Sequence, residues 1–159
     1  MREQGEGWTL INGDCIEELA GLPENHADMA VFSPPFSSLF TYSASERDIG
    51  NCATHEEFLE HLGYFIVELL RVMKPGRLAC CHIAQVTSTK ATHNVIGLID
   101  LRGAVTQAFV KSGFIYHGDV CIDKDPQAQA IRTHSKALLF VQLRKDSSWL
   151  RPALADYIL

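Results

Sequence analysis

The sequence has no apolar run as long as a membrane span requires. Its first residues, Met1 to Gly7, also lack the apolar segment of a secretory signal peptide. We therefore predict a cytoplasmic protein that has no membrane partner. The 159 residues, of which 47% are apolar and 21% charged, are enough for a single globular domain with a hydrophobic core.

Paired metal-binding cysteines are absent as well. The five cysteines form no C-x-x-C motif, and Cys80 and Cys81 are adjacent. Adjacent strand residues point to opposite faces of a sheet, so this pair suits neither a disulfide nor a shared metal ion. The spacing predicts free thiols in a reducing compartment and no metal site.

Positive charge is scarce, since the formal net charge is −5. A protein that binds nucleic acid needs basic groups where it meets the phosphates. If DNA is a partner, the basic contacts must be concentrated locally or lie in a segment outside these 159 residues.

Strand-like and helix-like patterns alternate along the chain. Strands are expected at Trp8–Asp14, Ala27–Phe32, Arg77–Ile83, Phe114–Ile122 and Lys136–Arg144. Helices are expected at Cys15–Leu22, from a capping box at Thr54–Glu57 to a stop at Lys74-Pro75-Gly76, at Leu98–Ser112, and starting within Ser147–Leu159. This order predicts an α/β fold, a doubly wound Rossmann-like sheet of about five strands with flanking helices and an antiparallel pair at one edge.

The strand Ala27–Phe32 is apolar enough to be buried on both faces, and Ser33-Pro34-Pro35-Phe36 ends it. Ligands of open α/β sheets bind beyond the carboxyl ends of strands, where this tetrapeptide lies. A Pro-Pro pair by itself is most often only a strand terminator. Here a polar residue precedes it and an aromatic residue follows it, which favours a binding site.

Two longer segments, one of which contains the tetrapeptide, resemble a known protein family. Asn12-Gly13-Asp14, followed by Asp28 to Phe36, resembles the S-adenosylmethionine-dependent DNA methyltransferases that act on exocyclic amines. Their signature is [Ser/Asn/Asp]-Pro-Pro-[Tyr/Phe/Trp], and Glu68 to Leu78 is similar to the helix and strand that follow it. The resemblance covers most of the chain. It implies S-adenosyl-L-methionine as cofactor, double-stranded DNA as partner, base flipping, and a place in restriction-modification.

The chemistry of amine methylation explains the residue types in the motif. The lone pair of an exocyclic amine is delocalised into the ring, and acceptors on its two protons favour the nucleophilic, pyramidal nitrogen. Ser33 Oγ can supply one acceptor and the Pro34 carbonyl the other, while Pro34 and Pro35 fix the backbone before the substrate arrives. Phe36 offers a face on which the flipped base can stack.

Asp14 is the second candidate residue. Asp after Gly is a common helix N-cap, and this interpretation competes with a binding role. The resemblance implies an acidic residue near the adenosyl part of the cofactor at this strand end, and it also places Ser33 beside the cofactor. Both roles of Asp14 remain open.

Other polar residues receive a structural interpretation. The proposed reaction requires no general base, so the histidines are not assigned a catalytic role: His82, His93, His117 and His134. In the stretch from Ser37 to Ala53, Phe40, Tyr42 and Arg47 either contact the flipped base or form a plain surface loop. Near His134, Arg132 and Lys136 either contact phosphate or end a solvated strand.

The resembled family holds the methionine end of its cofactor with a turn of the kind Phe-x-Gly-x-Gly, and the sequence contains none. Gly5-Glu6-Gly7 has no preceding strand and no third glycine in place. In the permuted subclass with the Pro-Pro motif first, that turn comes later. Residues 1–159 are therefore expected to be the catalytic part of one methyltransferase domain, which a C-terminal segment or a partner chain completes.

The resemblance leaves the target base open. Serine in the first motif position favours N4 of cytosine, and N6 of adenine is the close alternative. A non-catalytic remnant or subunit that needs a partner for its cofactor site is a second class of hypothesis. Methylation of RNA or of a protein glutamine is a third, which Ser33 and the segment order disfavour.

Overall fold

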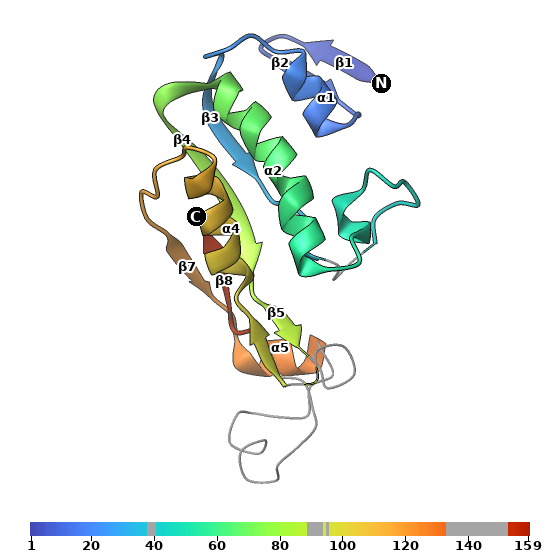
Figure 1. Ribbon diagram of the computed structural model, residues 1–159, viewed down its shortest axis with the longest axis vertical. Coiled ribbons are helices and arrows are strands. Elements are labelled where there is room, and N and C mark those ends of the chain that lie inside the picture. The colour runs from blue at the N-terminus through green and yellow to red at the C-terminus, as the bar shows by residue number, and fades with distance from the viewer. Residues whose placement is uncertain (38–40, 89–93, 95, 133–152) are drawn as a thin grey trace.

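The structure, a computed structural model, describes residues 1–37, 41–88, 94, 96–132 and 153–159. It is a mixed α/β fold whose largest sheet has the strand order β3-β4-β8-β7. These strands are β3 (Ala27–Phe32), β4 (Met73–Ala84), β8 (Ala155–Ile158) and β7 (Val120–Asp123). Helices α2 (His55–Val72) and α4 (Leu101–Lys111) lie against one face of this sheet (Figure 1). The α/β class predicted from the sequence is confirmed.

The sheet combines parallel and antiparallel pairs. β3 and β4 run parallel, and Phe32 is the register partner of Cys81. β8 runs antiparallel to both β4 and β7. An antiparallel pair thus lies at one edge, as predicted. One member, β7, overlaps the expected strand Phe114–Ile122 but is shorter, and the other, β8, was not expected. The helix expected within Ser147–Leu159 is wrong for its last residues, because backbone hydrogen bonds to two neighbouring strands hold 155–158 as β8. The expected strand Lys136–Arg144 lies outside the described residues.

Shorter elements complete the described chain. They are the hairpin of β1 (Arg2–Gly5) and β2 (Trp8–Ile11), the hairpin of β5 (Val86–Ser88) and β6 (Gly97–Ile99), the helices α1 (Cys15–Ala20) and α5 (Pro126–Arg132), and the 3₁₀ helix η2 (Ile49–Asn51). The sequence did not predict β1 or the β5–β6 hairpin, because strands of three or four residues are too short for alternation to show.

Helix α2 supplies more buried core residues than any other described element. Its buried side chains recur at helical spacing: Phe58, Leu62, Ile66, Leu69 and Val72. From α4, Leu101 and Val105 are fully buried against them, and from β4 so is Ile83. Phe32 contacts this cluster through the rings of Phe65 and Phe109, which lie 5.0 and 6.1 Å from its own. The core thus fixes the end of β3, which leads directly into Ser33.

The predicted capping box at the start of α2 is present in a modified form. Thr54 Oγ1 accepts a hydrogen bond from the Glu57 N–H at 3.1 Å. Glu57 reaches back to the N–H of Ala53 at 2.7 Å, one residue before the cap. The first contact satisfies a backbone donor that the helix leaves free at its first turn, and the second joins the helix to the residue before its cap.

Replacing Thr54 with alanine is expected to reduce the free energy of unfolding by about 1 kcal/mol, because one backbone donor of the first turn loses its acceptor. Urea denaturation of the two proteins measures this difference. Thr54→Ser keeps the hydroxyl and should stay close to the wild type. Equal losses for both variants would assign the effect to the methyl group of threonine and not to the cap.

The end of α2 lies close to the predicted stop, but β4 begins at Met73 and not at Arg77 as expected. The helix stops at Val72. The register between β3 and β4 then shifts over the stretch Lys74 to Arg77, which lies between the paired residues Ala27–Met73 and Met29–Leu78. Gly76 has φ of +75°, a conformation that favours glycine. The Lys-Pro-Gly sequence therefore turns the chain between the helix and the regular part of β4.

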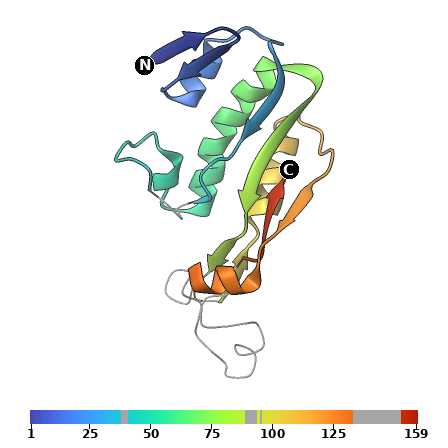
Figure 2. The same ribbon diagram turned by 180° about the vertical axis from the view of Figure 1, so that it is seen from behind.

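The prediction that β3 is buried on both faces is wrong, since one face of this strand is half-buried and the other is exposed. Met29 and Val31 are 58% and 73% exposed, and they share their face with Leu78 of β4 and with Val120 of β7. Figure 2 shows this face of the sheet toward the viewer, and none of the helices in the described part of the chain covers β3 and β4 there. Apolar β3 side chains on this face, which we call the open face, therefore have no second layer among the described residues.

Candidate functional site

The Ser33-Pro34-Pro35-Phe36 motif lies where the parallel strands β3 and β4 end. Ser33 is exposed, whereas Pro34, Pro35 and Phe36 are half-buried. Phe36 packs against the core cluster, so the motif is anchored on one side and open on the other. This is the sheet edge at which ligands of α/β folds bind, as the sequence predicted for the motif.

Ser33 contacts one neighbouring residue, His82 of β4, in two ways. Its hydroxyl donates to the His82 carbonyl oxygen at 3.2 Å. The same oxygen lies 3.2 Å from His82 Nδ1. Parallel pairing of β3 with β4 brings these residues together across 49 positions of sequence. Sequence reasoning left His82 without a role, because its spacing to Ser33 carries no local signal.

Beyond His82 lies a charged pair from the antiparallel edge. His82 Nε2 is 3.4 Å from Asp156 Oδ2, and the other Asp156 oxygen forms an ion pair with Lys124. The Asp156 and Lys124 side chains are only 15% and 21% exposed. Together these residues form a continuous row from the Ser33 hydroxyl to the Lys124 ammonium. Nothing in the sequence pattern indicated this row, since β8 was not predicted.

Two further features fix the geometry around Ser33. The Phe36 ring meets the His82 ring edge-on, with centroids 5.7 Å apart at 61°. Ser37, directly after the motif, is buried and has φ of +55°, which is uncommon for a residue with a side chain. The backbone therefore takes a left-handed conformation directly after Phe36.

Asp14 caps helix α1, so the cap interpretation is confirmed. Its Oδ1 accepts from the N–H groups of Ile16 at 2.9 Å and Glu17 at 3.3 Å. Its Oδ2 lies 3.0 Å from Arg47 Nε. The hydrogen bond from Arg47 to Glu17, together with the charge of Asp14, raises the pKa of this exposed guanidinium. Arg47, considered as a base contact from the sequence, thus joins the loop after the motif to the start of α1.

Of the other residues weighed from the sequence, Tyr42 is 67% exposed and His117 is exposed. Residues Phe40, His93, His134 and Lys136 lie outside the described part of the chain.

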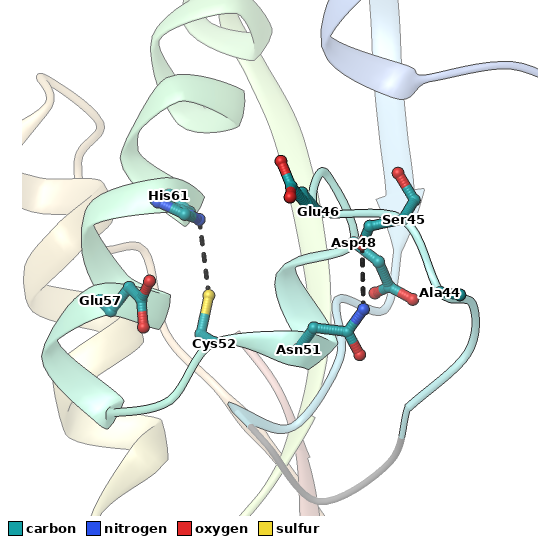
Figure 3. Close-up of a pocket in the computed structure, with 8 residues that line it drawn as sticks. All are labelled: Ala44, Ser45, Glu46, Asp48, Asn51, Cys52, Glu57 and His61. Atoms are coloured by element: carbon teal, nitrogen blue, oxygen red, sulfur yellow. Dashed lines mark hydrogen bonds between the residues drawn. The ribbon is translucent and has the colours of Figure 1, made fainter.

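A separate cavity of about 270 Å³ lies between the loop before η2 and the start of α2 (Figure 3). Within it, Cys52 Sγ is 3.5 Å from His61 Nδ1. Such a pair can activate a cysteine nucleophile, but here burial, followed by the charge of Glu57, raises the pKa of the thiol. Both effects disfavour the thiolate form of Cys52.

All five cysteines lie in the described part of the chain. All five cysteines are free thiols, and burial raises the pKa of Cys81 to about 12. In the part of the chain that the structure describes, no three His, Cys, Asp or Glu side chains gather as a metal site would require. Likewise, no described helix has both the length and the apolar character needed to cross a membrane.

Comparison with known proteins gives structural neighbours only. No family model and no curated protein matches the chain. TTHA0409 of Thermus thermophilus, assigned as a DNA modification methylase and solved with S-adenosyl-L-methionine, is 20% identical with a TM-score of 0.62. The match covers 92% of this chain and 52% of that protein.

Two other solved structures extend this result. The cytosine-N4-specific PvuII DNA methyltransferase is 16% identical, with a TM-score of 0.57 over 92% of this chain and 46% of its own. A SAM-dependent methyltransferase from Archaeoglobus fulgidus is 14% identical, with a TM-score of 0.50 over 93% of this chain and 65% of its own. The chain thus shares part of its α/β fold with these structures, and it spans about half the length of the Thermus and PvuII proteins.

Proposed function

We propose that this chain is the base-binding, catalytic part of a DNA methyltransferase that modifies an exocyclic amino group. One observation carries the proposal: a serine hydroxyl followed by two prolines and an aromatic ring stands exposed at the end of a parallel strand. The structural neighbours with this fold include a DNA modification methylase and a cytosine-N4-specific enzyme. The proposal includes the assignment of residues 1–159 to the catalytic part of one methyltransferase domain. It also includes the roles of the four motif residues.

The chain's own residues would act on the target base. Ser33 Oγ and the Pro34 carbonyl accept hydrogen bonds from the two amine protons, which draws the nitrogen lone pair out of conjugation. Pro34 and Pro35 fix the backbone direction before the base arrives. Phe36, anchored in the core, offers its ring to a base flipped out of the duplex. S-adenosyl-L-methionine, when bound, supplies a methyl group on a positively charged sulfur.

The described residues fit only one end of that cofactor. A carboxylate has about four acceptor positions, and Asp14 uses its oxygens for two backbone N–H groups and Arg47. Asp14 can therefore accept at most about one further hydrogen bond, such as that of a ribose hydroxyl. Because the sequence has no glycine-rich turn, we propose that a further segment or a partner chain holds the methionine end.

Two features of the sheet support the proposal that a further segment or a partner chain completes the cofactor site. Among the described strands, β3 pairs only with β4, so its second edge is unpaired. The open face beside that edge exposes apolar side chains such as Val31. Parallel strands are normally covered on both faces. These features also favour the second candidate function, a subunit that transfers no methyl group until a partner is added.

Calorimetry separates these possibilities at the level of the cofactor. The 159-residue chain should release no measurable heat of binding with S-adenosyl-L-methionine at micromolar concentrations, because the described residues can contact only one end of the cofactor. Sinefungin, a non-reactive analogue, serves as the matched ligand. Micromolar binding by the chain alone would contradict an incomplete cofactor site.

The target base is tested in DNA. The complete reading frame that encodes this chain is expressed in a host without amino-methylated bases, and its DNA is digested for mass spectrometry. We expect N4-methylcytosine, because serine occupies the first motif position. N6-methyladenine would assign the adenine alternative, and the absence of both would contradict DNA methylation.

A further inference from the structure

We propose that His82 is a positioning residue for methyl transfer, which holds Ser33 as an acceptor and receives the proton that the amine loses. This inference rests on the proposed function. It adds two residues, His82 and Asp156, that the methyltransferase motif does not contain.

The first step concerns the single proton of the Ser33 hydroxyl. A hydroxyl has one donor and two acceptor positions. Among the described residues, the groups bonded to the Ser33 hydroxyl both belong to His82: the carbonyl oxygen, which accepts, and Nδ1, whose role depends on the tautomer, each at 3.2 Å. With its proton directed toward β4, Ser33 presents its lone pairs on the exposed side. An arriving amine then meets an acceptor and not a competing donor.

The second step concerns the tautomer of His82. Nδ1 can accept from Ser33 only if the neutral ring carries its proton on Nε2. Nε2 lies 3.4 Å from Asp156 Oδ2, a carboxylate oxygen that accepts and cannot donate when ionised. Lys124, paired with the other oxygen, compensates the charge of Asp156. The edge contact with Phe36 limits rotation of the ring. Together these contacts favour the Nε2–H form.

The third step is the fate of the proton. The amine nitrogen forms its bond to the methyl carbon as the carbon–sulfur bond breaks, and sulfur keeps the electron pair. The nitrogen then carries one proton too many. That proton passes to Ser33 Oγ while the Ser33 proton passes to His82 Nδ1, which leaves a neutral methylamine and an imidazolium. Asp156 lies next to the new charge and stabilises it.

The tautomer is measured without any methyl transfer. Long-range ¹H–¹⁵N NMR spectra of the 159-residue chain should show His82 with a protonated Nε2 and an acceptor Nδ1. Asp156→Asn replaces the accepting carboxylate with an amide and should give a mixture of tautomers, whereas His117→Asn, at an exposed position, should leave the His82 signals unchanged. A protonated Nδ1 in the wild type would overturn the proposal.

Kinetics of the complete reading-frame product test the role in transfer. His82→Ala should lower kcat by about 10²-fold with little change in the KM for DNA, since the change affects the reacting amine and not DNA binding. His82→Asn places an amide oxygen near the former Nδ1 and should recover roughly tenfold of that loss by restoring the acceptor. His117→Asn is the control for losing a histidine.

The outcomes distinguish the inference from the proposed function. If the wild type methylates DNA and His82→Ala keeps its kcat, the positioning role is wrong while the proposed function stands. Equal losses for His82→Ala and His82→Asn, with unchanged thermal unfolding, would also overturn the acceptor role. If the wild type transfers no methyl group, the proposed function fails and the proton-transfer role fails with it.

Discussion

Replacing Ser33 with alanine is expected to lower kcat for methyl transfer by about 10²- to 10³-fold, the range for removing one hydrogen-bonding group from a reacting centre. The hydroxyl is exposed and stands at the end of β3, with its proton directed to His82. Its removal takes an acceptor from the target amine. Rates of methyl transfer to DNA by the complete reading-frame product measure the effect.

Cofactor binding should change little in this variant, because the lost oxygen acts on the amine. Ser112→Ala is a matched control: its hydroxyl donates to Ala108 within the last turn of α4. Unchanged turnover of Ser33→Ala would remove the mechanism proposed for the motif. A loss of cofactor binding equal to the loss in kcat would move Ser33 from the acceptor role to a cofactor contact.

The second large effect is on stability. The same substitution, leucine to alanine, is compared at a buried position and at an exposed one. Leu62 of α2 is 1% exposed in the core, whereas Leu78 of β4 is 52% exposed on the open face. Leu62→Ala should reduce the free energy of unfolding by about 2–5 kcal/mol, through lost burial and a residual cavity. Leu78→Ala should cost about 0.5 kcal/mol, because water already reaches the side chain.

Denaturant unfolding of the 159-residue chain measures both variants. If Leu62→Ala does not fold, Ile66→Val removes a single methyl group from the same helix face and should cost about 1 kcal/mol. Equal costs for Leu62→Ala and Leu78→Ala would mean that the open face is covered in solution. That result would contradict the one-sided burial of β3.

Local signals in the sequence predicted much of the fold. The period of apolar residues defined α2 and its buried face, and Lys-Pro-Gly marked where it ends. A run of apolar residues closed by two prolines located β3 within its observed limits, Ala27–Phe32. Helical spacing likewise predicted α1, and a cap by Asp14 was one of the two roles considered for that residue. Each of these features depends on residues within a few positions of one another.

The errors concern partners that are distant in sequence. Whether Val31 is buried depends on a second layer and not on its own apolar character, so a buried strand and an exposed one look alike. Residues 155–158 form a strand because β4 and β7 provide hydrogen bonds on either side. The four residues are too few for their own pattern to distinguish that strand from a helix.

The sequence by itself determined the Ser-Pro-Pro-Phe motif, its place after a strand, and the α/β class, because motif chemistry and periodicity are local. Only the tertiary structure decided which groups meet Ser33. His82 lies 49 positions away, and Asp156 joins it from an antiparallel strand still further along the chain. Sheet pairing brings these three residues into one row, and pairing between distant segments follows from the packing of the whole sheet.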